Sequence, residues 1–308
     1  MTNIYISLST FAEFGKIPLE ILNRNKFNLS FNKTNKRILT KDLIKYAADA
    51  DGIIAGVEKY DQEVIDCLPK LKCISRVGVG IDNIDLNYVK KKKIEIRNTP
   101  DEVILPVSEL TLSMMLSLLR KTFEQTQILK EGKWKKLGSN NLSDKKVGII
   151  GTGRIGKNIS ETLMYLGCNV MPCDLFPDLD WAKKNNLEYH SFEKILSECD
   201  IISLHASSET HRCLINIEQV KKMKEGVIVI NTSRGSLIDE EALVYGMNNK
   251  IIKGLGLDVF SNEPYQGKLT NFDNIILTPH VATLTAESRL KMEIKAVENL
   301  VEFFRKKI

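Results

Sequence analysis

The amino-acid sequence predicts an α/β protein with two doubly wound parallel sheets, each covered by helices. Short β-branched runs alternate with amphipathic helical segments over nearly the whole chain, a pattern typical of such sheets. The 308 residues fit one large domain or two of medium size. The expected strands are residues 4–8, 52–55, 73–77, 94–97, 146–150, 169–173, 201–205, 227–231, 254–258 and 274–277.

Helical patterns lie between these strands and at two apparent domain crossings. Shorter helices are expected over 40–50, 154–166 and 240–248, a long one over 101–131 and a final one over 286–306. Pro100 ends the segment after a strand, because a proline disfavours helix at the preceding residue. The second crossing follows His280. We therefore expect one domain of residues 1–98 and 285–308 and another of residues 99–284.

Composition and charge favour a cytoplasmic protein that binds neither nucleic acid nor membrane. The net charge of +5 is spread along the chain, and its densest cluster, Lys90 to Lys93, suits the end of a helix. The start of the chain lacks the pattern of a signal peptide, and the most apolar stretch, 103–119, is interrupted by Pro106 and Glu109. The six cysteines form no C-x-x-C pair and no metal-ligand spacing with histidine, so we expect free thiols and no metal site.

A glycine-rich turn gives the first functional signal. The sequence Gly-Thr-Gly-Arg-Ile-Gly at 151–156 follows an apolar strand and opens a helix, the context that a dinucleotide-binding turn requires. Gly151 permits the tight turn, Gly153 lets the backbone approach a pyrophosphate, and Gly156 lets the helix pack closely on its strand.

The cofactor follows from the groups beside this turn. Amide N–H groups at the helix start, near Arg154 and Ile155, face the phosphates. Asp174 lies 18 residues past Gly156, where a carboxylate binds the ribose hydroxyls. It would repel a 2′-phosphate, and no arginine follows it directly, so NAD is favoured over NADP. The alternative is that Asp174 is a turn residue at a strand end.

The candidate catalytic residues follow strands in the second half of the chain. Reduction of a 2-oxo acid needs a cation for the carboxylate and a general acid for the carbonyl oxygen. Arg234 suits the first role and His280 the second. Glu263 would stabilise a protonated imidazole and fix its tautomer. Asp258 could accept a hydrogen bond from the nicotinamide carboxamide. The alternatives are that Arg234 is a surface arginine, that His280 is a structural histidine and that Asp258 caps a helix or turn.

Five motifs occur in an order that resembles the D-isomer-specific 2-hydroxyacid dehydrogenase family, most closely its phosphoglycerate dehydrogenase branch. The resemblance covers most of the chain. The motifs are the glycine turn at 151–156, Asn231-Thr232-Ser233-Arg234-Gly235, Gly256-Leu257-Asp258-Val259-Phe260, Glu263-Pro264 and Thr278-Pro279-His280.

The resemblance implies a Rossmann NAD-binding domain inserted in a flavodoxin-like substrate domain. It also implies that Arg234 binds the substrate carboxylate and carbonyl, that His280 is the acid/base, and that Glu263 pairs with it. Thr232 and Ser233 are then expected at the cofactor.

In the first domain the same resemblance places the substrate carboxylate at Arg76, Gly78 and Val79. Read from the residues alone, that segment is a glycine-rich turn that suits an anion. The family also implies a homodimer, with the long helix after Asn98 in the interface; a buried core helix of a monomer is the alternative.

One loop departs from the family pattern. His205-Ala206-Ser207-Ser208-Glu209-Thr210 has no proline and is one residue shorter than the family pattern, near where the nicotinamide would lie. The sequence thus predicts an NAD-dependent D-2-hydroxyacid dehydrogenase, with 3-phosphoglycerate and phosphohydroxypyruvate among its candidate substrates. The alternative is an NAD-sensing, corepressor-like interaction protein that keeps the dehydrogenase fold.

Overall fold

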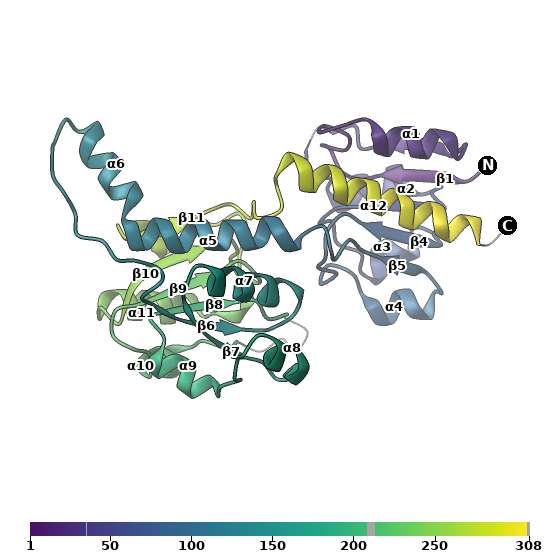
Figure 1. Ribbon diagram of the computed structural model, residues 1–308. Coiled ribbons are helices and arrows are strands. Elements are labelled where there is room, and N and C mark those ends of the chain that lie inside the picture. The colour runs from purple at the N-terminus through teal and green to yellow at the C-terminus, as the bar shows by residue number, and fades with distance from the viewer. Residues whose placement is uncertain (35, 208–212, 307–308) are drawn as a thin grey trace. The chain divides into compact units, whose positions relative to one another are not determined.

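The computed structural model describes residues 1–34, 36–207 and 213–306 (Figure 1). The chain divides into two compact units. Unit 1 comprises Met1–Val103 and the segment from Thr283 onward, and unit 2 comprises Ile104–Ala282. The sequence placed these crossings after residues 98 and 284. The structure moves the first to Val103 because the helix that belongs to unit 2 begins only at Ile104.

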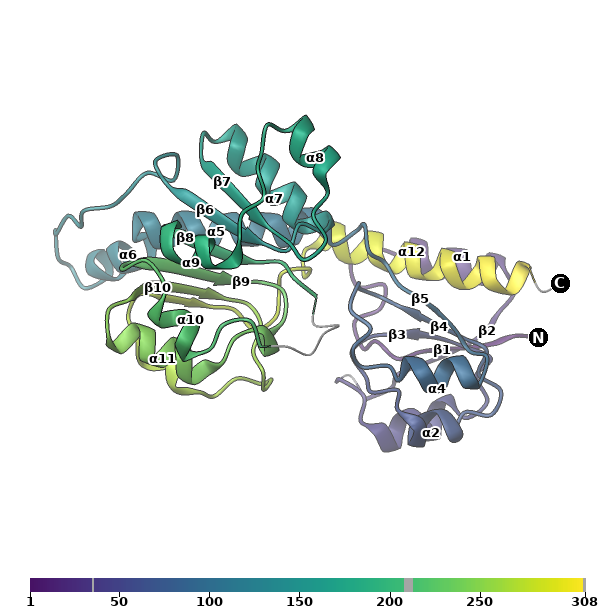
Figure 2. The ribbon, with the colours of Figure 1, turned by 90° about the horizontal axis from the view of Figure 1, so that it is seen from below.

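Unit 1 is a five-stranded parallel sheet with the order β2-β1-β3-β4-β5. Helices α1 and α12 lie on one side of this sheet, and α2 and α4 lie on the other (Figure 2). The strands are β1 Asn3–Ile6, β2 Asn28–Phe31, β3 Gly52–Ala55, β4 Cys73–Arg76 and β5 Glu95–Arg97. The helices are α1 Ile17–Arg24, α2 Thr40–Ala47, α3 Gln62–Asp66, α4 Leu86–Lys91 and α12 Ala286–Arg305.

Unit 2 is a six-stranded parallel sheet with the order β11-β10-β9-β8-β6-β7. Its strands are β6 Lys146–Ile150, β7 Asn169–Cys173, β8 Ile201–Leu204, β9 Val227–Asn231, β10 Ile252–Leu257 and β11 Ile275–Leu277. Its helices are α5 Ile104–Arg120, α6 Thr122–Lys130, α7 Arg154–Tyr165, α8 Leu179–Lys184, α9 Phe192–Glu198, α10 Ile217–Lys221 and α11 Glu240–Asn248, with 3₁₀ turns η1 Gly235–Leu237 and η2 Lys268–Asn271.

These two sheets confirm the predicted α/β class. Strands β8 and β9 are buried at every position, as expected for parallel strands covered on both faces. In unit 2, α5 and α7 pack on one face around Met114 and Leu163, and α9 and α11 pack on the other around Ile195 and Leu243. The strand order reverses between β6 and β8, so the carboxyl ends of these strands are the expected place for a ligand.

The long helix predicted over 101–131 is two helices in the structure. The chain turns at Lys121, whose φ of 50° lies in the left-handed region. The buried positions of α5 end at Leu119, and α6 has no buried residue. Since α6 lacks a core to pack on, it stands away from the rest of unit 2 as an arm (Figure 1).

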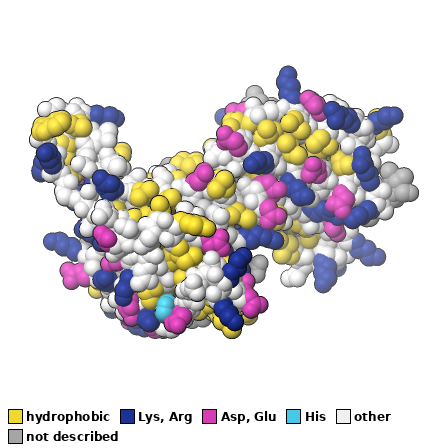
Figure 3. Space-filling model, in the orientation of Figure 1, with side chains coloured by type: hydrophobic (Ala, Val, Ile, Leu, Met, Phe, Trp, Pro, Cys, Tyr) yellow, Lys and Arg dark blue, Asp and Glu magenta, His cyan; other side chains and the backbone are white. Residues whose placement is uncertain are grey.

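The structure places the densest lysine cluster of the sequence at the end of a helix. Lys90 and Lys91 lie in the last turn of α4, where cations complement the helix dipole. Lysine and arginine are mixed with acidic side chains over the face drawn in Figure 3. Among the helices of residues 1–34, 36–207 and 213–306, none is long and apolar enough to cross a membrane.

Candidate active site

The glycine turn lies between β6 and α7, and two of its glycines cannot carry a side chain. Gly151 has a φ of 94°, and a Cβ on it would meet the backbone N of Ala206 at 2.6 Å. A Cβ on Gly156 would overlap the carbonyl oxygen of Gly151. A Cβ on Gly153 would meet no heavy atom within 4 Å, so a ligand has room beside this backbone.

The start of α7 is built to receive an anion. Gly153 is the N-cap and supplies no side-chain hydrogen bond, so the first amides of the helix, at Arg154 and Ile155, are not capped by it. Such a helix start attracts a pyrophosphate through its N–H groups and its dipole. The turn therefore fits the phosphates of a dinucleotide.

Asp174 follows β7 and is tied to the glycine turn. Its carboxylate accepts hydrogen bonds from the N and Oγ1 of Thr152, at 2.5 and 3.0 Å, and from the N of Phe176 at 2.9 Å. A carboxylate accepts about four hydrogen bonds, so this one can still receive a ribose hydroxyl. The Tyr189 hydroxyl, 2.8 Å from the Oγ1 of Thr152, extends the network and was not predicted.

His205, directly after β8, is a neutral histidine behind the glycine turn. Its backbone N donates to the Ile150 carbonyl at 2.7 Å, and its Nε2 lies 2.8 Å from the Oγ of Ser203. Burial lowers the pKa of this imidazole to about 4, so it is uncharged at neutral pH. The prediction for the shortened loop concerns residues 206–210, of which 208–210 lie outside the described residues.

Arg234 follows the end of β9 on a short turn. Its backbone is extended, with a φ of −142° and a ψ of 133°, and its Nη1 donates to the Ser233 carbonyl at 2.8 Å. Thr232, two residues before Arg234, is buried, and its Oγ1 lies 2.8 Å from the Oγ1 of Thr111 on α5. Because Thr111 donates to the Val107 carbonyl at 2.8 Å, Thr232 is the donor of this pair.

His280 and Glu263 meet, as the sequence predicted. The Nδ1 of His280 lies 3.0 Å from the Oε2 of Glu263, whose other oxygen accepts the N–H of Phe260 at 3.1 Å. The side chain of His280 is 51% exposed. With Nδ1 held by the carboxylate, Nε2 is the nitrogen left to face a substrate.

Contacts of the backbone bring Arg234 and Glu263 to the same edge of the sheet. β9, β10 and β11 are neighbours and parallel, so their carboxyl ends meet there. A Cβ on Gly235 would overlap the carbonyl group of Phe260 and the N of Ser261, the residues that lead to Glu263. The turn of Arg234 therefore packs directly on the turn of Glu263.

Asp258 holds the segment that contains His280, a contact that the sequence did not indicate. The side chain is fully buried. One oxygen accepts from the Oγ1 of Thr278 at 2.6 Å and the N of Val281 at 2.8 Å, and the other accepts from the N of Ala282 at 3.0 Å. These donors lie on both sides of His280, whose φ is 56°. The contact with a nicotinamide carboxamide stays a prediction.

The predicted substrate segment of unit 1 begins at Arg76, the last residue of β4, and one of its groups has another partner. The N–H of Gly78 donates to the Oγ1 of Thr99 at 2.8 Å, so in this structure it is not available to a carboxylate. Arg76 folds over Gly78, where a Cβ would overlap its guanidinium, and its Nη1 donates to the Val77 carbonyl at 3.2 Å. Val79 is exposed. The roles of Arg76, Gly78 and Val79 at a substrate carboxylate stay predictions.

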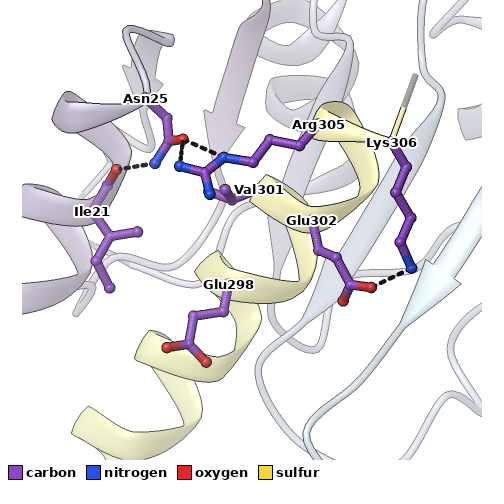
Figure 4. Close-up of a pocket in the computed structure, with 7 residues that line it drawn as sticks. All are labelled: Ile21, Asn25, Glu298, Val301, Glu302, Arg305 and Lys306. Carbon is purple, nitrogen blue, oxygen red and sulfur yellow. Dashed lines mark hydrogen bonds and ion pairs between the residues drawn. The ribbon is translucent and has the colours of Figure 1, made fainter. Parts of the chain in front are cut away.

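A groove of about 430 Å³ on unit 1 contains none of the predicted residues (Figure 4). It lies between α1 and the end of α12. Its cation Arg305 donates to the Oδ1 of Asn25 at 2.9 Å, and Lys306 pairs with Glu302 at 2.5 Å. Both cations of the groove therefore interact with other residues of this chain, so we do not assign the groove to the active site. In the described part of the chain, no group of three or more His, Cys, Asp or Glu side chains could hold a metal ion.

The features of unit 2 define a class of protein. A strand, glycine turn, helix and acid form a dinucleotide site, and an arginine with a histidine–glutamate pair lies at neighbouring strand ends. This is the site of an NAD-linked oxidoreductase. Residues 112–282 match the model of the D-isomer specific 2-hydroxyacid dehydrogenase, NAD binding domain, and the chain belongs to this family. It is an NAD-dependent oxidoreductase of 2-oxo and 2-hydroxy acids, and its cofactor is NAD.

Individual relatives cover nearly the whole chain. Hydroxypyruvate reductase of Thermotoga maritima is 35% identical over 91% of this chain and 94% of its own length. Glyoxylate reductase of Thermofilum pendens is 34% identical over 85% of this chain and 80% of its own. The crystal structure of D-lactate dehydrogenase from Aquifex aeolicus with NAD and lactic acid has a TM-score of 0.87 at 28% identity, covering 99% of this chain and 96% of that one.

Proposed function

We propose that this protein uses NADH to reduce a small 2-oxo acid without a phosphate, either glyoxylate to glycolate or hydroxypyruvate to D-glycerate. The observation that carries the proposal is the packing of the Arg234 turn against the turn of Glu263, which pairs with His280. The names of the relatives from Thermotoga and Thermofilum support this choice of substrate. Phosphohydroxypyruvate, the substrate of the branch favoured by the sequence, becomes the competing outcome.

Each side chain has a separate task in this reaction. Arg234 binds the carboxylate through two parallel hydrogen bonds, which fixes the orientation of the adjacent carbonyl. NADH, when bound, supplies the hydride to C2 of the acid. His280 donates a proton from Nε2 to the carbonyl oxygen as negative charge develops there. Glu263, whose carboxylate lies beside Nδ1 of His280, keeps the imidazole in one orientation and balances its positive charge before the proton is transferred.

The residues around the glycine turn would hold the cofactor. The amides of Arg154 and Ile155 would bind the pyrophosphate, and Asp174 the adenosine ribose. Thr232 and Ser233 lie directly before Arg234, which suits the nicotinamide end.

The first experiment is NADH oxidation with a panel of 2-oxo acids. We expect the highest kcat/KM with glyoxylate or hydroxypyruvate, and much slower turnover with NADPH. Preference for phosphohydroxypyruvate would reassign the substrate. NADH binding without turnover of any acid would favour the alternative, an NAD-sensing interaction protein.

Two variants test the assigned roles. His280→Gln should lower kcat by about 10²- to 10⁴-fold, the usual contribution of a general acid, with little change in NADH affinity. His190→Gln, which changes a histidine outside the site in the same way, is the matched control. Equal activity of the two variants would contradict the role of His280.

We also propose a cytoplasmic homodimer in which a second copy covers the arm. Phe123 and Leu129 on α6 and Trp134 after it are 59, 57 and 85% exposed, and apolar side chains gather on this arm in Figure 3. Exposed apolar groups of this kind mark an interaction surface. The six cysteines are all free thiols, which suits a reducing compartment.

Sedimentation of the purified protein tests the dimer. We expect the mass of two chains for the wild type and for Leu39→Asp, a change of an exposed residue in unit 1. Trp134→Asp should shift the equilibrium toward the single chain. A wild-type protein that sediments as one chain would overturn the proposal.

A further inference from the structure

A buried asparagine lies at the base of the Arg234 turn. Asn231 is the last residue of β9, is 1% exposed, and pairs with Leu204 of β8 and Leu257 of β10. Its backbone carbonyl accepts the N–H of Asp258 at 3.0 Å. The residue is therefore fixed at the centre of the sheet, and a buried amide in this position requires hydrogen-bond partners.

Within the described parts of the chain, the partners of its side chain belong to the next three residues. The Oδ1 of Asn231 accepts from the N of Ser233 at 3.1 Å and from its Oγ at 2.9 Å. The Nδ2 donates to the carbonyl of Arg234 at 2.8 Å. The amide thus bonds the chain at both ends of the turn. Both the oxygen and the nitrogen of the amide therefore bond the backbone of this turn.

We propose that Asn231 is the positioning residue of Arg234: its amide sets the backbone from which the guanidinium projects toward the substrate carboxylate. This inference rests on the proposed role of Arg234. The opposite side of the turn is fixed by Gly235, whose Cα lies against the backbone of Phe260 and Ser261. The backbone of Arg234 is therefore held between the sheet and the turn of Glu263.

Only an asparagine side chain meets these requirements at this length. The site needs an acceptor for the two donors of Ser233 and a donor for the carbonyl of Arg234. An ionised aspartate has no donor, and a serine is too short to bond both ends of the turn. Loss of the amide leaves the carbonyl of Arg234 with the N–H of Leu237, at 3.3 Å, as its remaining partner in the turn.

Kinetics of Asn231→Ala and Asn231→Ser give the first test. A displacement of about 1 Å in a positioning group lowers activity by as much as 10²-fold, so we expect kcat/KM for glyoxylate to fall about 10- to 100-fold. The inhibition constant of oxamate, a 2-oxo acid analogue, should rise in parallel. Asn249→Ala is the matched control, because Asn249 also donates its Nδ2 to a backbone carbonyl, that of Tyr245 at 2.8 Å, but on an exposed helix end.

A double-mutant cycle separates positioning from general stability. If Asn231 acts through Arg234, Asn231→Ser should have little further effect on kcat/KM in an Arg234→Ala background. An equal loss in both backgrounds would overturn the proposal. So would an Asn231 variant with wild-type kcat/KM and oxamate inhibition.

Amide hydrogen exchange tests the positioning role of Asn231 independently of enzyme turnover. The amides of Ser233 and Leu237 should exchange faster in Asn231→Ser than in the wild type, while those of α11 stay unchanged. Unchanged exchange at both positions would refute the positioning role. A wild-type protein that reduces none of the acids in the panel would refute the proposed function, and the exchange result would still stand on its own.

Discussion

Because burial keeps His205 uncharged, the free energy of unfolding depends on pH, and the lowered pKa of His205 determines the direction. Burial lowers the pKa of its imidazole from 6.5 to about 4 in the folded chain. Below pH 6.5 the unfolded chain therefore takes up a proton that the folded chain does not bind. The contribution of His205 to stability is complete above pH 6.5 and is lost progressively as the pH falls toward 4.

The size of this effect follows from the two pKa values. Linkage gives a loss of about 2 kcal/mol in the free energy of unfolding between about pH 8 and about pH 5. The imidazole keeps some contact with solvent, which screens its charge. We therefore expect a loss of about 1 to 2 kcal/mol that is specific to His205.

Urea unfolding of the wild type and of His205→Asn at about pH 8 and about pH 5 measures the effect. The variant loses the titrating group, so its free energy of unfolding should fall less between the two conditions, by about 1 to 2 kcal/mol. His190→Asn is the control, because burial also lowers the pKa of His190, and it shows how much a second histidine contributes. If wild type and His205→Asn lose the same stability, the reasoning about His205 fails.

Three further predictions concern the glycine turn, the ribose site and the thiols. Gly156→Ala should lower NADH affinity by at least about 10-fold in a fluorescence titration, because its Cβ overlaps the carbonyl of Gly151; unchanged affinity would contradict the packing described. Asp174→Ala should weaken NADH binding by about 10-fold and raise the ratio of NADPH to NADH turnover, and a fixed ratio would argue against contact with the ribose. Iodoacetamide at about pH 8 should label the exposed Cys67 but leave Cys199 unmodified, because burial raises the pKa of the Cys199 thiol to about 12; mass spectrometry of peptides decides.

The buried parts of the fold could be predicted from the sequence, and the exposed parts could not. Strands β8 and β9 are mostly apolar and buried at every position, so their positions were visible in the chain. Strand β2 was missed because it is a short edge strand with mostly exposed side chains, although its residues alternate between polar and apolar. The break at Lys121 was missed because it depends on where the core ends, and no proline or glycine marks that point.

The candidate site shows the same division. Asp174, Arg234 and His280 follow strands at fixed offsets, so their approximate places could be inferred. The contacts of Asn231 and Asp258 could not, because a hydrogen bond between a side chain and a nearby turn leaves no periodic mark in the sequence.

The backbone of His280 has a consequence for how this enzyme could vary. Its φ of 56° lies in a region that L-amino acids other than asparagine, aspartate and histidine rarely occupy. A glycine would fit that conformation with less strain, yet it could not donate a proton as an imidazole does. Selection for stability and selection for catalysis therefore oppose each other at this residue, and a descendant freed from catalysis would gain stability by losing its histidine.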